Sequence, residues 1–196
     1  ARESLTTATS RLTSVVELLR RMQEATTRRE LEELRHKIRS AYLELASAQD
    51  ALRIDVEALL IRERDRRRRF DARKAGRTQV DLGDGVQTVL DDHEIISNST
   101  VFVAVHEHIT RASTRAHERL LNGGVDEMVI LNQRSVSDSL AMLAEALGND
   151  SGDDPPFEQG AAAGGSSGGS GADESAALPS IAELKLLRSM QAALLE

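Results

Sequence analysis

The sequence contains no cysteine and very few aromatic residues. Without cysteine, structural disulfides, thiolate metal sites and cysteine nucleophiles are all excluded. Aromatic residues make up 2% of the chain, as one tyrosine, three phenylalanines and no tryptophan. Aromatic side chains supply much of the buried area of compact cores and are enriched in strands. A core made instead of Leu, Val, Ile and Ala suits thin layers between long helices, so the composition indicates an all-α fold.

Long apolar runs are absent as well, and one stretch lacks positive charge. No run approaches the roughly 20 apolar residues that cross a bilayer, and no signal peptide is recognisable. No Lys or Arg lies between Ser135 and Leu184, where acidic residues account for the net charge of -7. The rest of the chain is close to neutral, so an anionic partner is not excluded. Because the chain begins at Ala1 and stops at Glu196 inside a predicted helix, we expect a processed product or a fragment, with room for a signal or membrane anchor outside it.

Apolar residues three and four positions apart predict long antiparallel helical hairpins, which form a coiled-coil-like bundle over residues 4–147. The first hairpin is expected over 5–74, with one helix before and one after Thr26 and Thr27, which are candidate caps. If the two threonines do not break the helix, the two helices run on as one. The heptad seam of the first helix consists of Leu5, Ala8, Leu12, Val15, Leu19 and Met22, and Val16 and Leu18 widen it.

The second hairpin is expected over 99–147, after a connector at 76–98 in which Gly and Asp residues predict a turn. Asn122, Gly123 and Gly124 predict a stop between its two helices, because glycine readily adopts the left-handed conformation that ends helices. So short a connection makes the two helices antiparallel neighbours.

Residues 148–178 are predicted to be a disordered acidic linker rich in Gly and Ser. Such a composition buries too little apolar surface to offset the entropy of ordering it. A tethered amphipathic helix follows over 179–196, where Ser180 and Glu183 form a capping-box pattern. We expect this helix to dock on the bundle or on another protein. Its candidate docking residues are Ile181, Leu184, Leu187, Met190 and Leu194.

The densest charged feature is the segment 62–77, where nine basic residues stand against three acidic ones and leave a net charge of +6. The phosphates of nucleic acids and anionic lipid headgroups are candidate partners. The alternative is a solvated helix end, since cations at a helix C-terminus complement the helix dipole. The candidate anion-binding residues are Arg62, Arg64, Arg66, Arg67, Arg68, Arg69, Arg73, Lys74 and Arg77.

No pattern of residues predicts a catalytic, cofactor or metal site. The sequence contains no P-loop, dinucleotide-binding fingerprint, Ser-His-Asp order or H-E-x-x-H motif. His106 and His108 are two positions apart and point to different sides of a helix, so we expect ordinary surface or boundary residues. The acidic cluster at 91–94 matches no EF-hand loop. The sequence therefore predicts no enzyme, no cofactor and no small-molecule substrate.

Polar residues beside the apolar seams are candidates for buried positions. Gln49, Asp50 and Asp55 lie beside the seam of the second helix, and Asn132 and Gln133 lie beside that of the fourth. Buried polar residues can set the register of a helical bundle. We expect Asp50 and Asp55 at the solvent boundary, and either environment is open to Gln49 and Asn132.

Three segments follow one another towards the end of the chain: HITRASTRAHERLLNGG, ILNQRSVSDSLAMLAEAL and LPSIAELKLLRSMQAALLE. This order resembles a group of large, uncharacterised, coiled-coil-rich helical proteins of planctomycete-type bacteria. The resemblance covers most of the chain, and Ala182 to Gln191 carry it most specifically. It implies a bacterial protein that is exported or membrane-associated rather than cytoplasmic, and it carries over no activity and no site residue.

The heptad spacing, together with the lack of a catalytic pattern, favours a non-enzymatic structural or protein-interaction module. Its seams would close within the chain, between copies of the chain, or with another protein. The alternative is an anion-binding module that uses segment 62–77 on nucleic acid or on an anionic membrane surface.

Overall fold

The structure, a computed structural model, consists of helices over the described residues. Its described secondary structure is helical, and no strand occurs among the described residues, which confirms the predicted all-α class. The linker predicted over 148–178 lies outside the described residues, apart from Gly148. The backbone is described over 2–148 and 180–193, and the side chains over 14–148 and 182–192.

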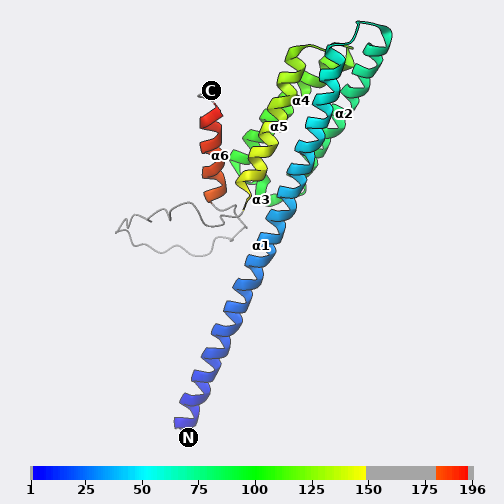
Figure 1. The fold of residues 1–196 in the computed structure, drawn as a ribbon. Helices are drawn as coiled ribbons and strands as arrows, with labels where there is room; N and C mark the ends of the chain where they lie inside the picture. Colours follow the sequence, from blue (N-terminus) through cyan, green and yellow to red (C-terminus); the bar gives the residue numbers. More distant parts are fainter. Residues whose placement is uncertain (1, 149–179, 194–196) are drawn as a thin grey trace. The chain divides into compact units, whose positions relative to one another are not determined.

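The chain divides into two compact units, the first ending at Lys37 and the second starting at Ile38. Helix α1 contributes residues to both units. In the second unit, the C-terminal part of α1 lies beside α2, α4 and α5 (Figure 1). The helices are α1 (Arg2–Leu60), α2 (Arg66–Asp91), α3 (Glu94–Ser97), α4 (Thr100–Leu121), α5 (Glu127–Ala146) and α6 (Ser180–Ala193).

Helix α1 runs without interruption through the break that was predicted at Thr26 and Thr27. The Thr26 hydroxyl donates to the carbonyl oxygen of Met22 at 2.9 Å, and the Thr27 hydroxyl donates to that of Gln23 at 3.1 Å. Both hydroxyls therefore bond within the helix, one turn back, instead of capping a new one. The alternative of one continuous helix is the arrangement observed.

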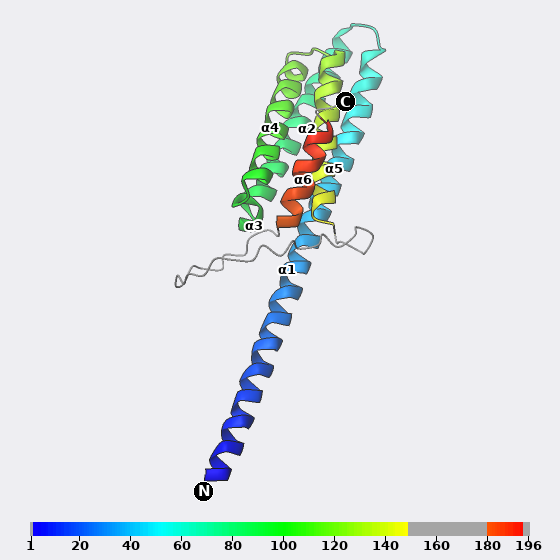
Figure 2. The ribbon, with the colours of Figure 1, turned by 90° about the vertical axis from the view of Figure 1, so that its left-hand side faces the viewer.

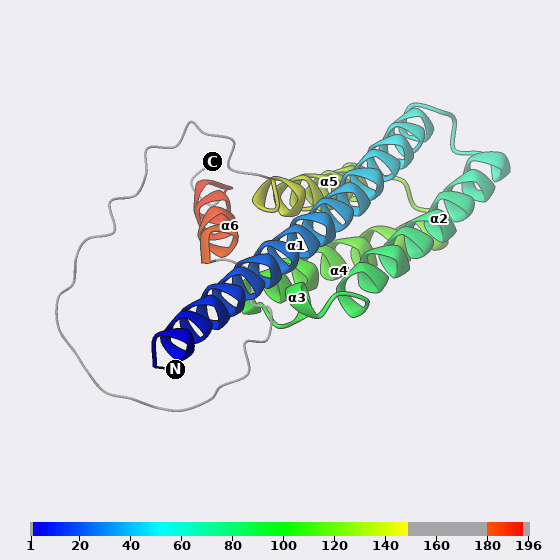
Figure 3. The same cartoon turned by 90° about the horizontal axis from the view of Figure 1, so that it is seen from below.

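The prediction that the second helix continues to Lys74 is wrong, because α1 ends at Leu60 and residues 61–65 form a turn. Asp65 caps α2: its carboxylate accepts a hydrogen bond from the backbone N–H of Arg68 at 2.6 Å. Such a cap satisfies a donor that the first helical turn leaves unpaired. Seen from below, the turn joins α1 to α2 so that α2 runs back along α1 (Figure 3).

The connector predicted over 76–98 is mostly helix, because α2 continues to Asp91 through three glycines. At Gly76, a Cβ atom would lie 2.9 Å from the backbone nitrogen of Leu121. The glycine therefore permits the close approach of α2 to α4, and the predicted turn is wrong. Packing of α2 outweighs the cost of glycine in a helix, which is about 1 kcal/mol per residue.

Helices α4 and α5 agree with the prediction. Ser99 caps α4, which ends at Leu121, and Gly123 has a φ of 78°, in the left-handed region expected of a glycine stop. Asp126 caps α5 by accepting a hydrogen bond from the N–H of Val129. The two helices pack as antiparallel neighbours because the connection between them is short.

The core of the second unit is aliphatic, as the composition indicates. Of the described aromatic side chains, Tyr42 and Phe102 are fully buried, whereas Phe70 is exposed. One buried cluster joins the four long helices, and it consists of Leu52, Val56, Leu59, Ala72, Ala75, Ala116, Leu120 and Val129.

Candidate functional site

Helix α6, the predicted docking helix, packs on its own bundle against α5 and α4 (Figure 2). Ala182 and Leu186 are buried in this contact. The Ser99 hydroxyl, at the start of α4, donates a hydrogen bond to a carboxylate oxygen of Glu183 at 2.6 Å. The structure therefore places α6 on the chain itself, which is one of the two arrangements expected from the sequence.

The face of α6 that packs on the bundle is not the predicted one. Leu184 is 62% exposed and Leu187 is 45% exposed, while Met190 is half-buried. The side chain of Ile181, and all of Leu194, lie outside the described residues. The buried residue Ala182 and the predicted residue Leu184 are two positions apart, so their side chains point in nearly opposite directions on the helix. The predicted set therefore does not coincide with the side that packs on the bundle.

The candidate anion-binding residues are divided between the turn at 61–65 and the N-terminal half of α2. Arg62 pairs with Asp71 at 2.8 Å. Arg68 is buried and donates to the carbonyl oxygen of Val125 at 3.2 Å, so it supports the α4–α5 connection and is not available to an anion. Seven others are exposed and form no ion pair with a described side chain: Arg64, Arg66, Arg67, Arg69, Arg73, Lys74 and Arg77.

The basic residues occupy the opposite end of a helix from the one expected. The sequence suggested cations at a helix C-terminus, but Arg66 and Arg67 open α2, whose last turn ends at Asp91 with Asp92 as its cap. A helix N-terminus carries partial positive charge, so each exposed cation there costs about 0.3–1 kcal/mol. The basic residues in the first turn of α2 and the acidic residues at its C-terminus both oppose the helix dipole. Stabilisation of a helix end therefore does not explain the basic segment.

Two exposed apolar side chains accompany these charges: Phe70 is 69% exposed and Ile61 is 87% exposed. Neither residue was assigned a role from the sequence. Phe70 is nevertheless an aromatic residue inside the basic segment, in a chain with few aromatic residues. On α2, positions separated by three, four or seven residues share one side of the helix. One exposed side, here named the basic face, therefore carries Arg66, Phe70, Arg73, Lys74 and Arg77.

In the first unit, α1 exposes a run of large apolar side chains on one side. Charged residues of the same stretch pair along the other side, Arg20 with Glu24 at 3.3 Å and Arg21 with Glu17 at 3.2 Å. The apolar stripe consists of Val15, Val16, Leu18, Leu19 and Met22, each between 51% and 63% exposed. The side chains of the other seam residues, Leu5, Ala8 and Leu12, lie outside the described part of the chain.

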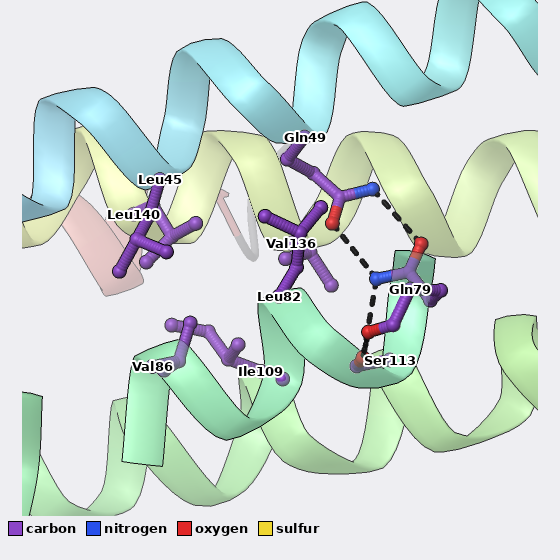
Figure 4. A pocket seen from close by; sticks show the side chains of 10 residues that line it. Leu45, Gln49, Gln79, Leu82, Val86, Ile109, Ser113, Val136 and Leu140 are labelled. Carbon is purple, nitrogen blue, oxygen red and sulfur yellow. Dashed lines mark hydrogen bonds between the residues drawn. The ribbon is translucent and has the colours of Figure 1, made fainter. Parts of the chain in front are cut away.

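A polar layer crosses the core of the second unit, with one residue from each long helix, and Figure 4 shows Gln49, Gln79 and Ser113 of this layer. The amides of Gln49 and Gln79 bond each other reciprocally, at 3.0 Å and 2.8 Å. The Gln79 amide nitrogen also donates to the Ser113 hydroxyl at 3.1 Å, and Gln133 donates to the Gln79 amide oxygen at 3.0 Å. All four side chains are buried, and Gln79 is the centre to which the other three are bonded.

The structure resolves the question of which polar residues lie inside. Gln49 and Gln133 are buried, whereas Asn132 is half-buried and donates to the carbonyl oxygen of its own helix at Met128. Gln79 and Ser113 were missed, because Gln79 was assigned to the connector. Its position seven residues after Ala72 and four after Ala75 marks it as interior once the helix is recognised.

A second buried polar pair joins α1 to α4, where the Tyr42 hydroxyl lies 2.8 Å from His106 Nε2. Burial lowers the pKa of His106 to about 4, although the charge of Asp91 acts in the other direction. Burial also raises the pKa of Tyr42 well above its ordinary value. Near pH 7 both groups are neutral, and the hydrogen bond between the phenol oxygen and Nε2 takes its direction from the tautomer of the ring, whose Nδ1 is buried without a hydrogen-bond partner among the described residues. His106 is thus a core residue and not the surface residue expected, whereas His108 is exposed.

Three further findings concern metal sites, membrane-spanning helices and similarity to known proteins. The described residues include no group of three or more His, Asp or Glu side chains placed to hold a metal ion. No described helix is long and apolar enough to cross a membrane. The resemblance to helical bacterial proteins stays a prediction. No protein-family model, curated protein or solved structure matches the chain.

Proposed function

We propose that this protein is a non-enzymatic structural module that associates with further copies of itself through the apolar stripe of α1. The exposure of five large apolar side chains on one side of a single helix carries the proposal. Apolar residues gathered in this way mark surfaces that other protein surfaces cover. The heptad spacing of Val15, Leu19 and Met22 is that of a helix packed against other helices.

A second copy of the chain fits the stripe because the stripe itself carries no charge. The ion pairs of Arg20 and Arg21 lie on the opposite side of the helix, so two stripes meet without bringing like charges together. Burying the exposed half of one such side chain contributes about 1 kcal/mol, or about 10 kcal/mol for two copies. Association itself costs about 4–15 kcal/mol, so we expect an assembly that depends on protein concentration.

The test is the solution mass, measured by light scattering after gel filtration at two protein concentrations. We expect the unaltered chain to exceed the mass of one copy, increasingly so at the higher concentration. Leu19→Asp should reduce it to a single copy, because a carboxylate would be buried at the centre of the contact. Ile54→Asp is the matched control, since Ile54 is 58% exposed on the same helix outside the stripe. A single-copy mass for the unaltered chain at both concentrations would rule the proposal out.

Anion binding through the segment 62–77 is a second candidate function, and the charge distribution of α2 favours it. Seven exposed cations without ion pairs to described side chains lie in the turn at 61–65 and the N-terminal half of this helix, and those of its first turn, Arg66, Arg67 and Arg69, oppose its dipole. Phosphate groups of a partner would offset that repulsion. The proposed ligand is therefore a surface that presents many phosphates.

Reversing two charges at the start of α2 should change stability and anion binding in opposite directions, so the two effects can be measured apart. In Arg66→Glu/Arg67→Glu, we expect the free energy of unfolding to rise by about 1 kcal/mol, because anions are favourable at a helix N-terminus. Binding to a phosphate-bearing polyanion should weaken in the same variant. Arg115→Glu, in the middle of α4, is the control that should change neither quantity. Urea unfolding and salt-dependent binding measure the two effects, and loss of stability in the double variant would contradict the dipole argument.

A further inference from the structure

The basic face of α2 has the composition of a helix that lies on a membrane surface. Phe70 stands between Arg66 on one side and Arg73 and Lys74 on the other, one helical turn from each. Helices that bind at a membrane interface combine cationic side chains with an apolar residue that enters the boundary between headgroups and acyl chains. The long stems of Arg and Lys let the charged ends reach headgroups while the ring goes deeper.

Two of the three acidic side chains of the segment 62–77 are already engaged, and Asp81 is the first acidic residue that follows on the same side of α2. The Asp65 carboxylate accepts the capping hydrogen bond of α2, and Asp71 pairs with Arg62. Of the three acidic residues in the segment, Glu63 alone lacks a described partner. An approaching anionic surface therefore meets a local excess of positive charge, and each cation near such a surface contributes about a fivefold gain in binding.

The turn at 61–65 supports the same assignment. Its first residue, Ile61, is the most exposed large apolar side chain described, at 87%. The Arg62–Asp71 ion pair ties this turn to the part of α2 that carries Phe70. An aliphatic side chain in that position gains from acyl chains but gains nothing from a nucleic acid backbone.

On these observations we infer that the basic face of α2 binds the surface of an anionic membrane, with Phe70 inserted among the lipids. This inference rests on the anion-binding function proposed above and names its partner. Nucleic acid is disfavoured because single strands are held on several stacked aromatic rings. In the described residues, the other two aromatic side chains, Tyr42 and Phe102, are buried in the core.

The experiment uses the full chain and two kinds of vesicle, one of phosphatidylcholine alone and one with about 30% phosphatidylserine, near physiological salt, where an anionic surface attracts nearby cations. Co-sedimentation should show binding to the anionic vesicles and not to the neutral ones. Arg73→Gln/Lys74→Gln/Arg77→Gln should weaken that binding about a hundredfold, at about fivefold for each charge. The three residues are exposed, so circular dichroism should stay unchanged.

Phe70→Ser distinguishes insertion from simple charge attraction. We expect it to weaken vesicle binding about tenfold, because the ring no longer transfers from water to lipid. Met128→Ser is the matched control, since Met128 is an apolar residue of α5 with 51% exposure and no basic residue three or four positions away. It should leave vesicle binding unchanged.

A third probe, duplex DNA, distinguishes binding to a membrane from binding to phosphates in general. Binding to DNA together with vesicle binding that is indifferent to Phe70→Ser would overturn the membrane assignment and leave the anion-binding function standing. Failure to bind either probe would overturn both. Vesicle binding that both sets of substitutions weaken, with weaker attachment to DNA, supports the inference.

Discussion

Replacing Gln79 with Leu should lower the free energy of unfolding by about 4 kcal/mol. The substitution keeps the approximate volume of the side chain but removes every hydrogen bond that the Gln79 side chain makes within the polar layer. Gln49 then loses both of its amide bonds, Gln133 loses its donated bond, and Ser113 keeps only its bond to the backbone carbonyl oxygen at position 79, all in a buried environment. Each unsatisfied buried polar group costs about 1–3 kcal/mol. Urea unfolding followed by circular dichroism measures the change.

Two further variants test whether the loss of stability comes from the polar layer or from removing any glutamine of the helix. Gln87→Leu removes an exposed glutamine of the same helix and should change stability by about 0.5 kcal/mol or less. Replacing all four residues of the layer by apolar ones should restore most of the lost stability, because no buried polar group is then left unpaired. If Gln79→Leu lowers the free energy of unfolding by less than about 1 kcal/mol, the hydrogen bonds of the layer contribute little to stability.

The layer also bears on the register of the bundle. Apolar faces made of Leu, Ala and Val pack in several registers with similar energies, because dispersion contacts have no direction. The amides of Gln49 and Gln79, the hydroxyl of Ser113 and the amide nitrogen of Gln133 meet in one alignment of the four helices, and the buried Gln133 amide oxygen has no hydrogen-bond partner among the described residues. We therefore expect the apolar quadruple variant to be stable but less uniquely packed, which NMR line widths would report.

Acid should destabilise the folded chain through His106. In the folded state the ring stays neutral down to about pH 4, whereas in the unfolded state it takes up a proton near its ordinary pKa of about 6.5. Between these values the unfolded state binds more protons, so stability falls as the pH decreases. The loss is about 3 kcal/mol, is complete near pH 4, and is absent above about pH 7. Unfolding midpoints measured from pH 7.5 to 4 check it.

The contribution of His106 is isolated by a paired substitution. Tyr42→Phe/His106→Leu removes the titrating ring without leaving the Tyr42 hydroxyl unpaired, so stability should depend less on pH between 6.5 and 4. His108→Leu removes an exposed histidine of the same helix and should leave the acid sensitivity in place. Equal pH dependence in the unaltered chain and the paired variant would assign the effect to other groups.

The sequence determined the elements whose signals are local. Helix α4 and its end follow from the Ser99 cap, the apolar spacing and the Gly123 stop, which act within a few residues of each other. The all-α class follows from composition and heptad spacing, because these describe the kind of surface that each segment must bury. The aliphatic core and the basic segment were visible in the same way.

Tertiary contacts decided the rest, because they are properties of pairs of segments. The turn at 61–65 competes with a continued helix, and folding α2 back onto α1 buries an apolar face that the continued helix would leave in water. Gly76 resembles a turn residue until Leu121 of another helix is placed against it. Gln79 acquires its side-chain partners from residues at least 30 positions away, and the pKa of His106 is lowered by burial in the packed bundle. Burial and long-range hydrogen bonds depend on that distant arrangement, and local spacing does not encode it.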